Sequence, residues 1–483
     1  MPKTDLCIDV LGTSVTISAN EDRKYLDFIL DKYRQYIGDV QRRTGLKDPM
    51  KIAILTGFLL CDDLEKAGRP DPNNKEPLEA EQLTLGMISR LDEIIGPAGQ
   101  KAGNDVFKLQ STIKNYDWGS REWLPAFLGR KNLSRIPWAE LWLRVNPSGS
   151  DKLPLLFKVL AAEKPLSIQV HPNIEQARDG FERENRQGIP LDAPNRNYRD
   201  SNCKNEIICA LSPFVAMCGF REQWEITSLI EILSVISVES DEILKSYMGR
   251  LVAVLKDDNN LQAFLNGIYS FERESIKTLA LTIKSRLNLL KTDFPEYRNV
   301  WELCVYLSNL YPEDPGILAP FFLNIIELAP GEALYIPAGV FHAYIKGMGI
   351  ELMTDSDNVL RGGLTPKFVD TEEVLKILDF SGYKPQIIPA PDSGSLWHSY
   401  PAPTEDFSLS VMRGTGDTVI YPETDPAIML ITDGCATVTE SGTTISKGEA
   451  VFIPAGKKPA LSGTFTAYIA SASPGPFGWP DDL

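Results

Sequence analysis

The stretch Gly331–Lys367, GEALYIPAGVFHAYIKGMGIELMTDSDNVLRGGLTPK, predicts two β-strands and a turn that carry several chemically active side chains. It contains His342, one of only three histidines in the chain, shortly after a Pro-Ala-Gly turn. A second histidine, His171, lies in the short segment SIQVHP. Residues two apart in a strand share a face, so Gln169 and His171 should point the same way. We expect these two segments to meet across a β-barrel and to hold a metal ion.

The beginning of this stretch is repeated near the C-terminus. Residues 331–339 read GEALYIPAG and residues 448–456 read GEAVFIPAG, with seven of nine positions identical. A strand that ends in such a turn is typical of the mouth of a small jelly-roll barrel, so the repeat predicts two cupin-type barrels. Pro459 stands in the second copy where the first has His342. Only the first barrel is therefore expected to bind a metal.

Composition and charge limit the classes of partner. Lysine and arginine total 49 and aspartate and glutamate total 65, which gives a formal net charge of −16. This balance argues against nucleic acid as the main partner, but a local cleft can still attract an anionic substrate. Seven cysteines without regular spacing suggest reduced thiols in a cytoplasmic protein. The sequence has no pattern of a signal peptide and no apolar run that predicts a membrane span.

Changes in residue pattern along the chain predict a mainly β protein with two helical additions. A β-hairpin followed by amphipathic helices predicts an N-terminal α+β oligomerisation domain. A later region with helical periodicity predicts an α-helical subdomain inserted into the first barrel. Residues 172–202 are polar and irregular, which favours a surface excursion over a site. The predicted parts are residues 1–95 (the N-terminal domain, with a linker at 68–77), 106–220 and 312–383 (the catalytic barrel), 221–311 (the helical insertion) and 384–483 (the second, metal-free barrel).

Four residues are candidate metal ligands: Gln169, His171, Glu206 and His342. Imidazole is the usual ligand of first-row metals, and carboxylate is the next most common. Two imidazoles, a carboxylate and a neutral amide, with room left for water or substrate, suit Zn²⁺ acting as a Lewis acid. A single histidine on a strand is usually satisfied by ordinary hydrogen bonds. The prediction therefore depends on two of only three histidines lying in strand-end motifs.

Three segments closely resemble type I mannose-6-phosphate isomerases: LPLLFKVLAAEKPLSIQVHPN from residue 153, NCKNE from residue 202 and YIPAGVFHAYIKGMGIELMTDSDNVLRGGLTPK from residue 335. The resemblance extends from about Phe107 to the C-terminus. It implies interconversion of mannose 6-phosphate and fructose 6-phosphate with one Zn²⁺ per chain, in the carbohydrate metabolism that leads to GDP-mannose. It also implies roles for individual residues: the zinc ligands named above, the essential arginine Arg361, the active-site acid Glu351, the active-site tyrosine Tyr344, and Ser167, Lys158, Lys204 and Lys367 near the sugar phosphate.

The implied reaction moves a proton between C1 and C2 of the sugar through an enediol(ate). Glu351 is the first candidate for the base and Lys204 the second. Arg361 would place a permanent positive charge beside the oxygen that becomes negative. Two alternatives stay open at this point: Glu351 could only orient Arg361 or a ligand, and Lys158 could be a solvated strand residue.

The chain departs from the pattern of this family at two places. The family commonly has NHKPE, whereas this chain has Cys203 and Asn205 in place of the histidine and the proline. Asn146 likewise stands where a histidine is common. Any role of these histidines in opening the sugar ring therefore cannot be carried over to this chain. The third histidine of the chain, His398, lies outside the matching motifs, and we interpret it as structural.

Residues 1–95 resemble the ZapA family of bacterial cell-division proteins, through the hairpin IDVLGTSVTI and the helices that follow it. The resemblance implies a self-associating module and a possible cell-division partner. The alternative is an oligomerisation arm without a division role. For the barrels, the alternatives to an isomerase are a non-catalytic module that binds a sugar phosphate and an iron-dependent oxygenase. The glutamine ligand and the lysines expected near the phosphate argue against the oxygenase.

Overall fold

The structure is a computed structural model that describes most of the chain after residue 104 and short segments before it. The described residues are 4–10, 13–19, 29–31, 33–38, 56, 60, 105–132, 135–144, 153–237, 242–257, 260–392 and 394–472. The chain divides into two compact units, Met1–Gln100 and Lys101–Leu483.

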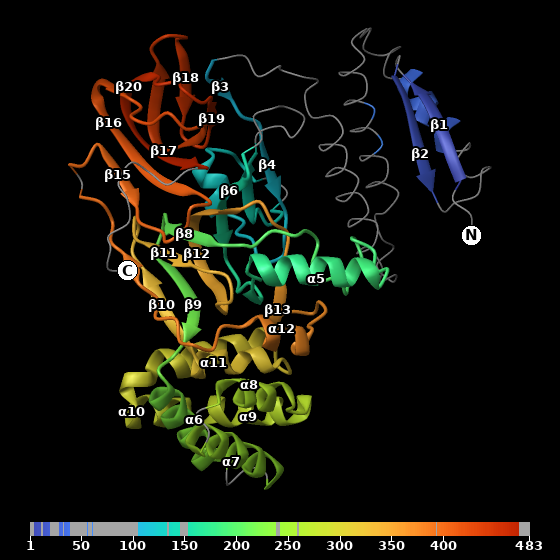
Figure 1. Cartoon of the computed structure of the whole chain (residues 1–483), viewed down its shortest axis with the longest axis vertical. Helices are drawn as coiled ribbons and strands as arrows, with labels where there is room; N and C mark the ends of the chain where they lie inside the picture. The colour runs from blue at the N-terminus through green and yellow to red at the C-terminus, as the bar shows by residue number, and fades with distance from the viewer. Residues whose placement is uncertain are drawn as a thin grey trace. The chain divides into compact units, whose positions relative to one another are not determined.

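The first unit contains the predicted β-hairpin. Strands β1 (Thr4–Val10) and β2 (Thr13–Ala19) pair in antiparallel orientation over their full length (Figure 1). Residues 29–31 and 33–38 are helical, as the spacing of their apolar side chains predicts. The linker expected at 68–77 and most of the later helices of this domain lie outside the described residues.

The first sheet of the second unit is organised around its longest strand, β12. The early part of β12 pairs with β7 and β9, and its later part pairs with β6 and β8. This strand therefore lies between segments that are far apart in the sequence. The strands of the sheet are β4 (Ser111–Lys114), β5 (Glu140–Leu143), β6 (Leu155–Ala162), β7 (Ile168–Val170), β8 (Glu206–Ala210), β9 (Phe214–Phe220), β10 (Leu323–Leu328), β11 (Ala333–Ile336), β12 (His342–Thr354), β13 (Leu360–Gly363) and β14 (Ile387–Ile388).

The second sheet is built mainly from the C-terminal part of the chain. Its strands are β3 (Phe107–Lys108), β15 (Trp397–Tyr400), β16 (Ser408–Ile420), β17 (Ala427–Val438), β18 (Thr443–Ser446), β19 (Ala450–Ile453) and β20 (Ala460–Ser471). Strand β3 is the exception, because it comes from the start of the segment predicted as the first barrel and pairs with β19. The mainly β architecture with added helices is confirmed, whereas the boundaries of the two barrels stay predictions.

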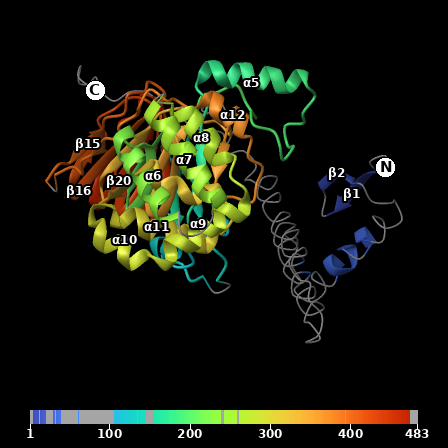
Figure 2. The same ribbon diagram turned by 90° about the horizontal axis from the view of Figure 1, so that it is seen from below.

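Helices occupy the segment predicted as an insertion. They gather beneath β9 and β10 in Figure 1 and face the viewer in Figure 2, and they pack around a core that includes the fully buried Trp301. None of the helices in the described part of the chain is long and apolar enough to cross a membrane. The helices of this segment are α6 (Gln223–Ser237), α7 (Glu242–Asp257), α8 (Leu261–Tyr269), α9 (Arg273–Ser285), α10 (Leu287–Asp293) and α11 (Arg298–Leu310), with 3-10 helices at Pro295–Tyr297 and, just after the segment, Pro315–Phe321.

Among the described residues of the second unit, three helices lie outside the insertion: α4 (Trp123–Phe127), α5 (Ile174–Arg186) and α12 (Thr371–Ile377). Helix α5 corrects the expectation that residues 172–202 are irregular throughout. It begins with a capping box, in which the side chain of Asn173 accepts from the backbone N–H of Gln176 and the side chain of Gln176 accepts from that of Asn173, both at 2.9 Å. The two residues three positions apart were a visible signal for this helix start.

Candidate active site

Strand ends bring two histidines and one glutamate together. His171 follows β7, Glu206 begins β8 and His342 begins β12. One ligand atom from each residue lies within 4.8 Å of the others, and all three residues are buried. Nε2 of His171 is 3.1 Å from Oε1 of Glu206, and Nε2 of His342 is 3.4 Å from Oε2 of the same carboxylate.

The orientation of the two imidazole rings fits a bound cation. Nδ1 of His171 donates to the carbonyl oxygen of Asn358 at 2.8 Å, and Nδ1 of His342 donates to that of Val340 at 3.0 Å. When Nδ1 of a neutral imidazole carries the hydrogen, Nε2 carries a lone pair. Both lone pairs then face the carboxylate of Glu206, and acceptors that face each other need a cation between them.

Electrostatics favour the neutral form of one ring. Burial and the ammonium of Lys204 lower the pKa of His171 to about 4. Glu206 is affected in the opposite sense. Although burial opposes its ionisation, Lys204 and His171 hold the pKa of its carboxyl well below the usual range. A neutral imidazole beside an ionised carboxylate is the donor set that a divalent cation requires.

Gln169 is placed beside this cluster by the backbone register. It lies directly opposite His342 in the β7–β12 pair and opposite Arg361 in the β7–β13 pair. Side chains directly opposite each other in antiparallel strands project from the same face of a sheet. Gln169, His342 and Arg361 are therefore arranged on one face at adjoining positions of three neighbouring strands.

Two further predicted residues contact the carboxylate of Glu206. Nζ of Lys204 is 3.0 Å from Oε1, and the hydroxyl of Tyr344 donates to Oε2 at 3.3 Å. Burial, together with the negative charge of Glu206, raises the pKa of Tyr344, so its hydroxyl keeps its hydrogen. Both contacts restrict the orientation of the carboxylate.

Glu351 and Lys158 form a buried ion pair rather than two separate groups. They lie directly opposite each other in the β12–β6 pair, with Nζ of Lys158 2.7 Å from Oε2 of Glu351. Nζ also lies 2.9 Å from Oε1 of Glu140, a residue that sequence reasoning did not single out. All three side chains are buried. Lys158 is therefore engaged by two carboxylates inside the protein, whereas the sequence suggested a contact with phosphate.

The environment of Glu351 raises the pKa of its carboxyl group to near neutrality. Burial raises its pKa to about 7, Lys158 opposes this shift, and the charges of Glu206 and Glu140 add to it. A carboxylate with a pKa near neutrality can both take up and release a proton at physiological pH.

A cluster of cations adjoins this region. Arg361, on β13, is half-buried, and the pKa of its guanidinium is lowered by burial and by Arg199. Burial, Arg361 and Arg199 in turn lower the pKa of the exposed Lys367. Among the described residues, no carboxylate forms an ion pair with any of these three side chains. Mutual repulsion of this kind is relieved by a bound anion. Ser167, half-buried, directly precedes β7.

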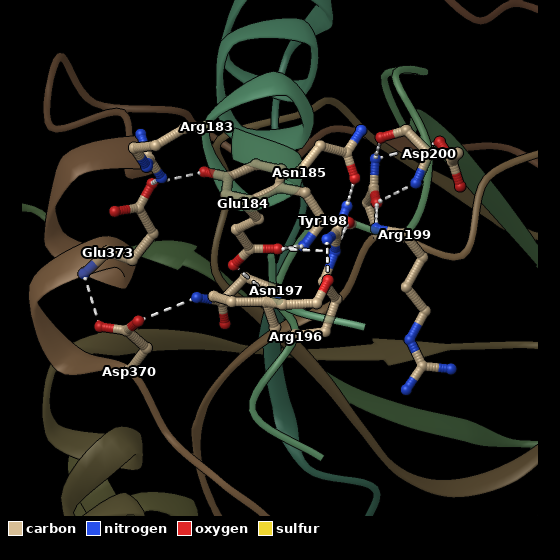
Figure 3. Close-up of polar contacts among 12 residues, drawn as sticks. Arg183, Glu184, Asn185, Arg196, Asn197, Tyr198, Arg199, Asp200, Asp370 and Glu373 are labelled. Atoms are coloured by element: carbon tan, nitrogen blue, oxygen red, sulfur yellow. Dashed lines mark hydrogen bonds and ion pairs between the residues drawn. The ribbon is translucent and has the colours of Figure 1, made fainter. Parts of the chain in front are cut away.

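Arg199 is a residue that the sequence did not single out, and its backbone is fixed by Asn358. The fully buried side chain of Asn358 accepts from the backbone N–H of Arg199 at 2.7 Å. It also donates to the side chain of Asp200 at 3.0 Å, and its backbone carbonyl orients His171. Figure 3 shows the side chain of Arg199 extending away from the polar contacts of its neighbours. The only visible signal for Asn358 was its place in the motif SDN.

The segment between α5 and Arg199 is held down by polar contacts with the region of α12 (Figure 3). The hydroxyl of Tyr198 donates to Oε1 of Glu373 at 2.8 Å, Arg183 forms an ion pair with the same residue, and Asn197 donates to Asp370 at 2.8 Å. Charge-assisted contacts of this kind fix the course of an irregular segment. They determine where Arg199 lies.

Of the positions at which the chain departs from the family pattern, the structure describes Cys203 and Asn205. Cys203 is half-buried, and its carbonyl accepts from the hydroxyl of Thr354 at 2.8 Å. Asn146 lies outside the described residues. His398 lies on β15 in the second sheet, with its ring edge-on to that of Tyr400, which agrees with a structural role.

Two family models match separate parts of the chain. Residues 144–223 match the model described as phosphomannose isomerase type I, catalytic domain. Residues 6–102 match the model described as cell division protein ZapA. The first match includes Gln169, His171 and Glu206 of the site, and the second lies entirely before it in the chain.

Full-length relatives extend the first of these matches. The mannose-6-phosphate isomerase of Shigella flexneri is 34% identical over 390 residues, which cover 73% of this chain and 95% of the relative. The Escherichia coli enzyme is 33% identical over 389 residues with the same coverage, and the human enzyme is 30% identical over 420 residues, covering 74% of this chain and 95% of the relative.

Solved structures give the same answer. A crystal structure of zinc-bound mannose 6-phosphate isomerase matches with a TM-score of 0.66 and 30% identity, covering 76% of this chain and 100% of that one. The apo form from Salmonella typhimurium matches with a TM-score of 0.66 and 30% identity, covering 76% and 99%. The chain therefore belongs to the mannose-6-phosphate isomerase family of type I, with a ZapA-like region at its N-terminal side.

Proposed function

We propose that this protein is a Zn²⁺-dependent aldose–ketose isomerase that interconverts D-mannose 6-phosphate and D-fructose 6-phosphate. One observation carries the proposal: two buried imidazoles present their Nε2 lone pairs to the carboxylate of Glu206. His171 directly follows β7, which pairs with β13, the strand that bears Arg361. The proposal is supported by relatives named mannose-6-phosphate isomerase, which this chain matches over 95% of their length.

Gln169, His171, Glu206 and His342 would hold the ion. When bound, Zn²⁺ supplies a Lewis acid that polarises the oxygens at C1 and C2 of the sugar. Lys204 and Tyr344 contact Glu206 and would keep its carboxylate oriented towards the ion.

Glu351 is our candidate for the group that moves the proton between C1 and C2. It is buried, and its pKa is raised to about 7, which suits a base that must also act as an acid. We propose that Lys158, bound between Glu351 and Glu140, orients Glu351 instead of contacting phosphate. Lys204 remains the second candidate for proton transfer.

Arg361, Lys367 and Arg199 form the anion site in this proposal. The guanidinium of Arg361 would lie beside the oxygen that becomes negative in the enediolate. Lys367 and Arg199 would neutralise the phosphate, with a hydrogen bond donated by Ser167.

The decisive test combines elemental analysis with an isomerase assay, before and after chelation. We expect one Zn²⁺ per chain, loss of turnover when the metal is removed, and recovery when Zn²⁺ is added. Saturable binding of mannose 6-phosphate without turnover would instead favour the non-catalytic sugar-phosphate module. A protein that binds no metal and converts neither sugar phosphate would contradict the proposal.

The anion site has its own test. Arg199→Ala and Lys367→Ala should each raise KM for mannose 6-phosphate by about tenfold, because each removes one charge-assisted contact. The value of kcat should change less. Lys346→Ala is the matched control, because Lys346 is an exposed cation on β12 outside the cluster. An unchanged KM in both variants would remove Arg199 and Lys367 from the phosphate site.

For the N-terminal region we propose self-association, with a division-related partner as the further possibility that the ZapA match suggests. Sedimentation velocity of the full chain should give a mass that rises with concentration, whereas the chain that begins at Lys101 should not show this rise. A full-length protein that stays monomeric at tens of micromolar, roughly the range in which weak oligomers assemble, would contradict self-association.

A further inference from the structure

The second sheet reaches the candidate metal centre through Asp406. This residue lies between β15 and β16, and its Oδ2 accepts from Nδ2 of Asn205 at 2.8 Å. The same oxygen accepts from the hydroxyl of Thr404 at 2.8 Å, and the backbone N–H of Asp406 donates back to that hydroxyl at 3.1 Å. Contacts within its own loop thus orient the carboxylate that accepts from Asn205.

The other end of the Asn205 amide holds the turn before His342. Its Oδ1 accepts from the backbone N–H of Ala338 at 3.1 Å. The next residue of the turn, Gly339, donates to the carbonyl of His171 at 2.8 Å. Val340, which follows, accepts from Nδ1 of His342. Hydrogen bonds and a short stretch of backbone therefore connect Asp406 to the ring of His342 and to the backbone of His171.

Asn205 also acts on the third member of the cluster by its place in the chain. It directly precedes Glu206, and its carbonyl accepts from the backbone N–H of Thr354 at 3.3 Å. Both polar atoms of its side chain and its backbone carbonyl thus form hydrogen bonds directly before Glu206, the first residue of β8. Proline, which is common at this position in the family, has no side-chain amide and could form neither side-chain contact.

We propose that Asp406, acting through Asn205, is a positioning residue for the metal centre. In this proposal the loop of the second barrel fixes the position of the turn at Ala338 and of the first residue of β8. This inference rests on the proposed function for the identity of the metal. The contact is charge-assisted, and residues that orient ligands in this way contribute strongly to metal affinity.

The test measures Zn²⁺ affinity of the full chain by competition with a chromogenic chelator, together with the Tm of the metal-free protein. Asn205→Ala and Asp406→Ala should each weaken Zn²⁺ binding by about tenfold. The double variant should be about as weak as either single variant, because both remove one connection. Asp406→Asn keeps an acceptor for the amide and should stay within about twofold of the natural protein.

Tyr400→Phe is the matched control. It removes another hydrogen bond between the same two parts, from the Tyr400 hydroxyl to the carbonyl of Gly331 at 2.9 Å, without touching Asn205. It should leave Zn²⁺ affinity unchanged. Affinities of Asn205→Ala and Asp406→Ala equal to that of the natural protein would overturn the inference and leave the isomerase standing. The inference would also be overturned if Tyr400→Phe weakened Zn²⁺ binding as much as Asn205→Ala and Asp406→Ala do. A natural protein that binds no Zn²⁺ would remove the proposed function and this inference together.

Discussion

The two copies of the GEA repeat have the same backbone and different chemistry. Gly331 and Gly448 have φ of +91° and +83°, and Gly339 and Gly456 have φ of +85° and +77°. These conformations favour glycine, which explains why the repeat keeps it at both ends. Between them lie the short buried strands β11 and β19.

The copies diverge directly after the second glycine, where residues 340–342 read VFH and residues 457–459 read KKP. In the first copy His342 begins β12 and turns a ring nitrogen towards Glu206. In the second copy Pro459 directly precedes β20, and its carbonyl accepts from the backbone N–H of Tyr421 at 3.0 Å. The sheet around the second copy packs an apolar cluster. One backbone arrangement can thus support a polar site or a packed core, and the side chains decide which.

The strongest test of this contrast replaces the histidine. His342→Ala should lower kcat/KM by about a thousandfold or more, because it removes a ligand and a transition-state interaction worth about 4 kcal/mol. Zinc content, measured on the same sample, should fall with it. Pro459→His should neither add a second Zn²⁺ nor change turnover. A second bound ion in Pro459→His would show that the two copies are closer in chemistry than we infer.

Glu351→Gln tests the proposed base. It should lower kcat by about 10²- to 10⁴-fold, the contribution typical of general acid–base catalysis, while Zn²⁺ content stays at one per chain. Steady-state kinetics with metal analysis separates this outcome from a loss of metal. Retention of more than about a tenth of the natural kcat would transfer the role to Lys204.

The pH profile gives a smaller and more specific effect. The active base is the carboxylate, so kcat/KM should rise as the pH increases through the pKa of Glu351, which burial raises from 4.5 to about 7. A bound cation lowers this pKa, so the limb should lie at or below about pH 7. Lys158 also lowers it, so Lys158→Met should move the limb to higher pH. A limb that moves to lower pH, or stays in place, contradicts the pairing of these two residues.

The mildest prediction compares equivalent core positions of the two copies. Ile336 and Ile453 are both buried, and truncation of either to alanine should lower the free energy of unfolding by about 2–5 kcal/mol. Only Ile336→Ala should also lower activity, because its strand leads into the turn before His342. Denaturant unfolding and kcat/KM of the two variants, measured below their midpoints, provide the comparison. Equal losses of activity would mean that both copies support the site to the same degree.

Part of this architecture could be predicted because local patterns encode it. Alternation and the repeat predicted the strand that precedes His171 and the strand that begins at His342, and helical periodicity predicted the insertion. Arg199 and Glu140 were missed because their importance comes from neighbours distant in sequence, which no local pattern shows. The two carboxylate partners of Lys158 were missed for the same reason, since they come from other strands.

The pairing of β3 with β19 has a consequence for synthesis of the protein. Phe107 lies opposite Phe452, so β3, near the start of the second unit, can pair only after β19 has been synthesised. Contacts between such distant segments form late and slow the folding of a chain. The second sheet can be completed only after β20 (Ala460–Ser471) has left the ribosome. The loop that carries Asp406 is made after all strands of the first sheet, so in our proposal the metal centre is completed only after its ligands have been synthesised.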